Sequence, residues 1–100
     1  MDKHPLSSIQ KLDPEFFRRI SECRDYVFTE GALPAKLKFL IAMALDAVHG
    51  ATGGVTSLAR QALQHGASKE EIMEALHVAA YIGGVGSAYT ASLGLDEVFD

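Results

Sequence analysis

The segment ALQHGASKEEIMEAL, residues 62–76, decides the fold because it ends one helix and begins the next. Gly66 follows an apolar helical stretch, and glycine is the residue found most often just beyond a helix C-terminus. Ser68 and Glu71 have capping-box spacing, in which each side chain accepts a bond from the backbone N–H of the other. Apolar residues recur at helical spacing from Ile72 onward. The segment therefore predicts two helices joined by a tight turn.

Similar signals on both sides of this turn predict an all-α chain of five or six helices. Asp13 can cap free N–H groups, and Pro14 suits the first position of a helix. No segment alternates with period two for long enough to predict a strand. We expect one domain over residues 1–100, with a polar and loosely held lead-in over 1–12. The expected helices cover 13–31, 34–49, 53–65, 68–83 and 85–93, with a final turn over 96–99.

The composition is typical of a small cytoplasmic protein. Apolar residues make up 48% of the chain, and the net charge of −4 attracts neither nucleic acid nor an anionic membrane. Cys23 is the only cysteine, so an internal disulfide is excluded and a reducing compartment is favoured. Residues 1–10 lack the apolar segment of a signal peptide, and the longest apolar run, 39–45, is too short to span a bilayer. We therefore expect a cytoplasmic protein that binds neither nucleic acid nor membranes.

The predicted helix over 34–49 is apolar almost all the way round. Its apolar side chains are Leu37, Phe39, Leu40, Ile41, Ala42, Met43, Ala44, Leu45 and Val48. A helix of this kind lies either at the centre of a fold or against a neighbouring subunit. Because a chain of 100 residues buries only a modest fraction of its own surface, we expect a homo-oligomer.

Two segments on either side of residue 77 resemble a known family. HGASKEEIMEAL (65–76) and AAYIGGV (79–85) are similar to the corresponding parts of the carboxymuconolactone decarboxylase family, which includes the alkyl hydroperoxidase D-like proteins. The resemblance extends over a family-like helical core at 34–93. Members of this family are all-α and commonly assemble as trimers or hexamers. The resemblance thus implies an all-α subunit of a trimer or hexamer.

The peroxidase members of this family carry a Cys-x-x-Cys-x-x-x-His motif on the third helix and a glutamate on the second. Aligned through the turn at 66–68, the two cysteines fall on Ala51 and Gly54. The histidine falls on Leu58, and the glutamate falls on Phe39. Peroxide reduction by this motif needs an activated thiolate, a resolving thiol and groups that move protons. The resemblance therefore implies the fold of the family without its thiol peroxidase chemistry.

His49 is the main candidate for acid–base catalysis. It comes just before the stretch where the family keeps its active site, and an imidazole titrates near neutral pH. The lactone decarboxylases of the family are expected to keep a histidine near the third helix. Leu58 occupies the closest equivalent position here, and a neighbouring histidine could substitute for it. The alternative is that His49 only ends its helix and interacts with the helix dipole.

Small and hydroxyl-bearing residues follow His49 and are the candidates for substrate binding. They are Thr52, Gly53, Gly54, Thr56 and Ser57. Free N–H groups at the start of a helix favour anions, and hydroxyl groups there can bind a carboxylate. The glycines leave room either for a ligand or for another backbone. The alternative for the hydroxyl groups is ordinary helix capping.

Other chemically active side chains have simpler interpretations. Tyr81 is a second candidate catalytic residue, and it shares a helix face with His77. The alternative for both is a polar group satisfied across a subunit interface. Cys23, on the apolar stripe of the first helix, is expected to be a small core residue, and His65 is expected to interact with a helix C-terminus. No histidine or cysteine joins the glutamates near Glu70 at metal-ligand spacing, so we expect no metal and no other cofactor.

Two functional hypotheses follow from the sequence. In the first, the chain binds a small anionic metabolite and catalyses lactone decarboxylation or a related proton transfer, with His49 as acid or base and Tyr81 assisting. In the second, it is a catalytically inactive oligomeric scaffold or subunit, and its apolar surface is the functional feature.

Overall fold

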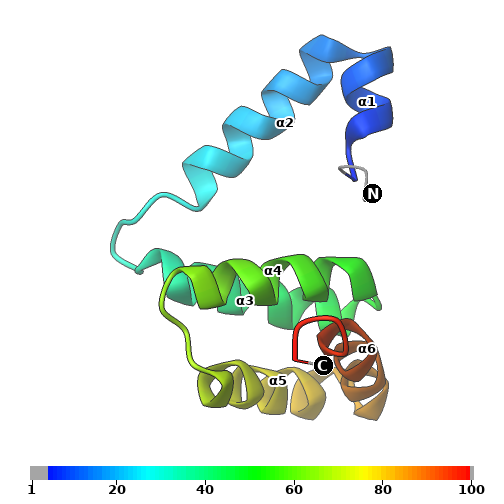
Figure 1. Ribbon diagram of the computed structural model, residues 1–100. Coiled ribbons are helices and arrows are strands. Elements are labelled where there is room, and N and C mark those ends of the chain that lie inside the picture. Colours follow the sequence, from blue (N-terminus) through cyan, green and yellow to red (C-terminus); the bar gives the residue numbers. More distant parts are fainter. Residues whose placement is uncertain (1–4, 100) are drawn as a thin grey trace.

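The computed structural model describes residues 5–99 and contains six α-helices in this range, with no strand. They are α1 (Ser7–Leu12), α2 (Pro14–Val27), α3 (Ala35–Val48), α4 (Thr52–Gln64), α5 (Lys69–Gly83) and α6 (Val85–Leu95). The predicted all-α fold is confirmed, and a short turn follows α6 at 96–98, inside the range where one was expected. Figure 1 shows α3 to α6 packed together, while α1 and α2 extend away from them.

Helices α3 to α6 form the body of the molecule, and every buried side chain of the described residues belongs to this part of the chain. Helix α3 packs against α4, α5 and α6, so it is the central helix. The side chains of Met43, Val55 and Ile72 come from three different helices and are fully buried. Alanines fill much of the remaining core, which lets the helices approach one another closely.

Helices α4 and α6 approach one another closely at Gly94. A methyl group at this position would lie 2.8 Å from the Cβ of Val55 and 2.9 Å from the carbonyl oxygen of Thr52. The hydroxyl of Thr56 donates a buried hydrogen bond of 2.6 Å to the Gly94 carbonyl. Glycine at 94 therefore brings the two helices into backbone contact, and Thr56 links them.

The turn between α4 and α5 has the geometry that the sequence predicts. The Ser68 hydroxyl accepts from the Glu71 N–H at 3.0 Å, and the Glu71 carboxylate accepts from the Ser68 N–H at 2.8 Å. Lys36 of α3 lies 3.0 Å from the same carboxylate, which ties the turn to the central helix. The backbone bond from the Ser68 N–H, followed by the bond from Lys36, lowers the pKa of Glu71. His65 interacts with the end of α4 as expected, with Nδ1 2.8 Å from the Gln61 carbonyl oxygen.

Helices α1 and α2 form an N-terminal arm with no buried residue. The two helices pack against each other, and only the C-terminal end of α2 reaches the helices of the body. At its base, the ring of Phe28 stacks on Phe39 of α3 at 4.4 Å between ring centres. Arg24 donates a hydrogen bond to Gln61 of α4. The arm is thus attached to the body at one end and projects from it at the other (Figure 1).

The arm corrects three predictions. Residues 7–12 of the expected loose lead-in form α1, because they pack against α2, whereas residues 1–4 lie outside the described residues. The helix expected over 13–31 ends at Val27. Cys23 is exposed instead of buried in a core, because no helix of the body packs along α2.

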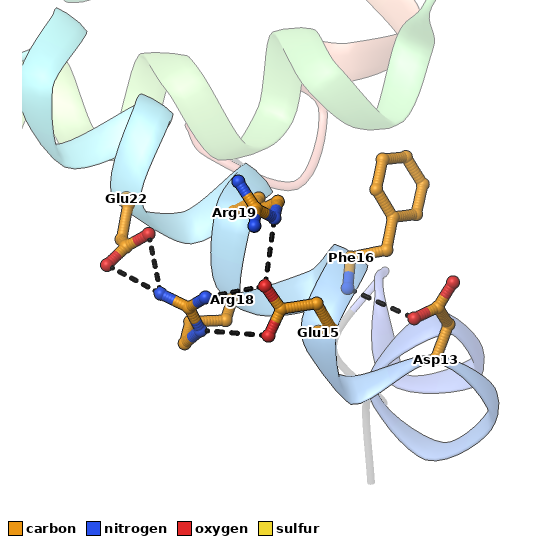
Figure 2. A network of polar contacts seen from close by, with 6 residues as sticks. All are labelled: Asp13, Glu15, Phe16, Arg18, Arg19 and Glu22. Carbon is orange, nitrogen blue, oxygen red and sulfur yellow. Dashed lines mark hydrogen bonds and ion pairs between the residues drawn. The ribbon is translucent and has the colours of Figure 1, made fainter.

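The opposite side of α2 carries a chain of ion pairs, which Figure 2 shows. Arg18 contacts Glu15 at 2.6 Å and Glu22 at 3.0 Å, and Arg19 contacts Glu15 at 2.9 Å. The bond to Glu15, followed by the charge of Glu22, raises the pKa of Arg18 further above its already high value. In the figure, the ring of Phe16 leaves the helix in a different direction from this network. The arm therefore separates a charged side from an apolar one.

Candidate functional site

The turn between α3 and α4 carries most of the residues that the sequence selects. Helix α3 ends at Val48, and His49 and Gly50 lead into α4. Gly50 has a positive φ of 77°, which L-residues rarely adopt, so glycine suits this tight reversal. The Ala51 N–H returns to the Asp46 carbonyl at 2.8 Å and closes the turn. The start of α4 is therefore held beside the last turn of α3.

Asp46 is the functional candidate that sequence reasoning missed. A methyl group at Gly54 would overlap the carboxylate of Asp46, so this carboxylate lies directly against the first turn of α4. Its oxygens have no hydrogen-bond or ion-pair partner among residues 5–99. The positive end of the α4 dipole stabilises a negative charge there. The spacing contained a signal, because Asp46 is the only acidic residue of α3 and precedes His49 by three positions.

His49 is exposed at the C-terminal end of α3, and its ring makes no hydrogen bond within the described residues. The imidazole is thus free to accept or donate a proton to a molecule from solvent. Asp46 and His49 are three residues apart at the end of α3, a spacing at which side chains on a helix can interact. The end of α3 therefore carries a carboxylate and an imidazole in neighbouring positions.

The first turn of α4 presents backbone donors. Gly53 and Gly54 occupy positions whose N–H groups have no carbonyl partner within a helix. No side chain caps this helix, so the prediction that its hydroxyl groups serve as caps is wrong for the described residues. Ala51, at the N-cap, has no side chain with which to do so. Helix α4 thus begins with open donors beside the Asp46 carboxylate.

The remaining candidates divide between this turn and other parts of the molecule. Thr52 is half-buried, and the exposed Ser57 hydroxyl accepts from Gln61 at 3.1 Å. Thr56 is buried, and its bond to Gly94 gives it a structural part between α4 and α6. Tyr81 is 87% exposed and makes no hydrogen bond to any of residues 5–99, so none of these residues holds it against the turn. The structure therefore places Thr52, Gly53, Gly54 and Ser57 at the turn but gives no support to Thr56 or Tyr81 as site residues.

The positions that correspond to the redox motif hold no thiol. Ala51 and Gly54 lie at the start of α4, and Leu58 lies one turn further along it. Phe39 is buried in the core, between the rings of Phe28 and His65. The one cysteine of the chain, Cys23, lies on the arm. A Cys-x-x-Cys peroxidase mechanism therefore has neither of its sulfur atoms at this site.

Two grooves lie away from the α3–α4 turn. The larger, of about 530 Å³, runs between α5 and α6, and Leu76, His77, Ala80, Ala88 and Ala91 are among the residues that line it. The other, of about 420 Å³, lies between α3 and α5. Across residues 5–99, no group of three or more histidine, cysteine, aspartate or glutamate side chains is placed to hold a metal ion. Within the same residues, no helix combines the length and apolar character needed to cross a membrane.

Comparisons with known proteins place the chain in a family. The model of the carboxymuconolactone decarboxylase family matches residues 14–97. A solved structure, the apo form of a carboxymuconolactone decarboxylase family protein from Legionella pneumophila, superposes with a TM-score of 0.84 at 32% sequence identity. The superposition covers 91% of this chain and 81% of that one. A search of curated proteins gave no match. The chain belongs to the carboxymuconolactone decarboxylase family.

Proposed function

We propose that the protein binds a small lactone-bearing carboxylic acid at the α3–α4 turn and transfers a proton next to its carbonyl group. The reaction class is lactone decarboxylation or a related proton transfer. The observation that carries this proposal is the unpaired Asp46 carboxylate against the start of α4, three residues before the exposed imidazole of His49. Membership of the family supports it, and the empty cysteine positions direct it away from thiol chemistry.

Each group at the turn has a distinct part in this proposal. In decarboxylation, the bond between the ring carbon and the carboxylate breaks, CO2 leaves, and His49 donates the proton that this carbon takes up. In a related proton transfer, His49 takes a proton from the carbon next to the carbonyl and returns it to a different carbon. Asp46 favours the charged imidazolium that forms in between. The open N–H groups of Gly53 and Gly54 stabilise the negative charge that develops on the carbonyl oxygen. Thr52 and Ser57 border this position and contact the rest of the ligand.

The charge of Asp46 narrows the choice of ligand group at the start of α4. A ligand carboxylate bound to these N–H groups would meet a like charge at short range, which disfavours it. A lactone carbonyl is neutral in the ground state and becomes negative only as the proton leaves. The site thus favours a carbonyl at the α4 N-terminus, with the carboxylate of the ligand pointing to solvent.

The proposal is tested by a thermal-shift screen against lactone acids and matched open-chain acids that lack the ring carbonyl. A ligand that binds only the folded state adds about 2.7 kcal/mol of stability at a hundred times its Kd, which such a screen detects. We expect lactone acids to raise the melting temperature and the open-chain acids to have little effect. Hits are then assayed for turnover with the wild-type protein and with His49→Gln, Asp46→Asn and the remote control Glu30→Gln.

The expected result is loss of turnover in His49→Gln, a smaller loss in Asp46→Asn and no change in Glu30→Gln. Ligand-induced shifts that are equal in the wild type and both site variants would place binding elsewhere and contradict the proposal. A panel with no shift at all would favour the alternative function.

The alternative is a structural subunit whose apolar surface holds an assembly together, and a specific observation favours it. The chain exposes 6818 Å², whereas a folded monomer of 10.8 kDa exposes about 5,500 Å². The excess of about 1,300 Å² exceeds the roughly 800 Å² that each partner buries in a standard interface. We therefore propose a homo-oligomer in either case, with catalysis as a property of the turn and assembly as a property of the exposed apolar faces.

A further inference from the structure

Helix α2 carries an exposed apolar stripe of the kind that binds to grooves. Phe16, Ile20, Cys23 and Val27 recur at positions i, i+4, i+7 and i+11, so they lie along one side of the helix. Phe16 is 51% exposed and Val27 is 47% exposed, because no helix of the body packs on α2. An amphipathic helix that lays such anchors into a groove is a recurrent mode of recognition.

The α5–α6 groove has the complementary form. Alanines at 80, 88 and 91 line it and leave space between the two helices, while Met73, Leu76, Leu95 and Phe99 supply its larger apolar contacts. The stripe from Phe16 to Val27 extends over about 16 Å, at about 1.5 Å per residue. The groove is lined on α5 from Met73 to Ala80 and continues along α6 to Phe99, so the stripe can lie along it. Large side chains on α2 therefore match small side chains along the groove.

Charge also matches between the two surfaces. Asp96 lies at one end of the groove and has no ion-pair partner among residues 5–99. Arg19 lies at the edge of the charged side of α2, is paired with Glu15 at 2.9 Å and is 70% exposed. A carboxylate at the groove and an exposed guanidinium on α2 favour one orientation of the docked helix.

Helix α2 does not lie in the α5–α6 groove of its own chain. Phe28 stacks on Phe39, and Arg24 bonds to Gln61, so the base of α2 is held on the α3–α4 side of the body. Helix α2 contacts neither α5 nor α6. An α2 helix that lies in this groove would therefore belong to a second copy.

We propose that α2 of one copy docks in the α5–α6 groove of another copy, so that the arms are exchanged between subunits. This inference rests on the assembly proposed above and names its contact. Each copy offers one arm and one groove, so repeated contacts of this type close into a ring or a reciprocal pair. The ligand site at the α3–α4 turn takes no part in it.

Cys23 makes the proposal testable by cross-linking, because it is the only cysteine and lies on the docking stripe. We would introduce Ala88→Cys or Ser92→Cys in the groove, and Gln64→Cys on α4 as the control, and oxidise each with diamide. A disulfide requires Cα atoms within about 7 Å, so it reports direct contact. We expect linked dimers between Cys23 and a groove position, identified by peptide mass spectrometry, and none with position 64.

A matched pair of variants tests the same contact without new thiols. Ile20→Asp places a charge on the stripe, whereas Tyr26→Asp makes a similar change on the same helix but to one side of the stripe. By light scattering at tens of micromolar, we expect the wild type and Tyr26→Asp to be oligomers and Ile20→Asp to shift to a smaller species. Circular dichroism of each variant confirms that the body remains folded.

The outcomes separate the docking mode from assembly in general. A wild-type monomer overturns both proposals. An oligomer that persists in Ile20→Asp, or one that links only Cys23 to Cys23, leaves assembly standing and overturns docking in the groove.

Discussion

The body and the arm carry the same kind of helical pattern but satisfy it in different ways. Each of α3 to α6 buries side chains against its neighbours in the same chain, whereas α1 and α2 bury none. The radius of gyration, 14.1 Å, exceeds the roughly 13 Å expected for a compact chain of this length, in line with a projecting arm. An apolar stripe therefore predicts that one face of a helix is suited to burial. The stripe does not indicate whether the same chain or another copy covers that face.

The largest effect should come from truncating the same residue type in the two regions. Ile72 is fully buried in the body, so Ile72→Ala should cost about 2–5 kcal/mol of unfolding free energy. Ile20→Ala on the arm should cost far less in a dilute sample, because no core surrounds this side chain. Urea denaturation of both variants at low concentration measures the contrast, and equal losses would show that the arm packs on its own body.

A second comparison, between two glycines of α6, tests how closely α6 packs against α4. Gly94→Ala introduces a methyl group 2.8 Å from Val55 and should destabilise the protein by roughly 1–3 kcal/mol. Gly86 lies on the same helix with nothing within 4 Å of an added methyl group, so Gly86→Ala should stabilise by about 0.5–1 kcal/mol. Thermal unfolding of both variants distinguishes the signs. A neutral Gly94→Ala would mean that α4 and α6 are less tightly joined than described.

The helix caps offer a smaller contrast of the same kind. Ser68→Ala removes half of the capping box of α5 and should cost about 1 kcal/mol of global stability. Asp13 caps α2 by accepting from the Phe16 N–H at 3.1 Å. Asp13→Ala should leave the urea midpoint of the body almost unchanged and lower only the helix content of the arm. A shift of the midpoint as large as that of Ser68→Ala would contradict the separation of the two regions.

The smallest expected effect concerns pH. Hydrogen bonding from the Ser68 N–H and from Lys36 lowers the pKa of Glu71 below its ordinary value of 4.5. The stabilisation from this carboxylate is therefore fully present above pH 4.5 and is lost as the pH falls through the lower folded value. Glu71→Gln should flatten the acid side of the stability curve, whereas Glu22→Gln on the arm should leave it unchanged. If the stability of the wild type and of Glu71→Gln fell equally with decreasing pH, Glu71 would not be the source of the acid sensitivity.

Local signals in the sequence are sufficient to predict the helices of the body and the turn between α4 and α5. The spacing of Ser68 and Glu71 predicts the capping box, and glycine at 66 predicts the turn before it, because these bonds form between near neighbours. The apolar stripe from Phe16 to Val27 predicts α2 equally well. Its exposure could not be predicted, because burial depends on long-range packing that periodicity does not contain. The burial of Cys23 was wrong for this reason.

The candidate site was predicted less completely than the fold. His49 and the residues from Thr52 to Gly54 follow from their place between two helices. Asp46 was missed, because its position over Gly54 depends on how α3 and α4 cross. Thr56 was chosen for its hydroxyl, but the carbonyl that this group meets belongs to Gly94, 38 residues further along the chain. Contacts of this range require the structure.

Hydrogen exchange measured at several protein concentrations tests whether a second copy of the chain stabilises the helical structure of the arm. We expect the amides of α2 to be protected at high concentration and to lose protection on dilution, as the oligomer dissociates. Amides of α3 and α4 should keep theirs, because their core lies within one chain. If light scattering finds only monomer and the amides of α2 are still equally protected, the proposal that a second copy covers α2 is wrong.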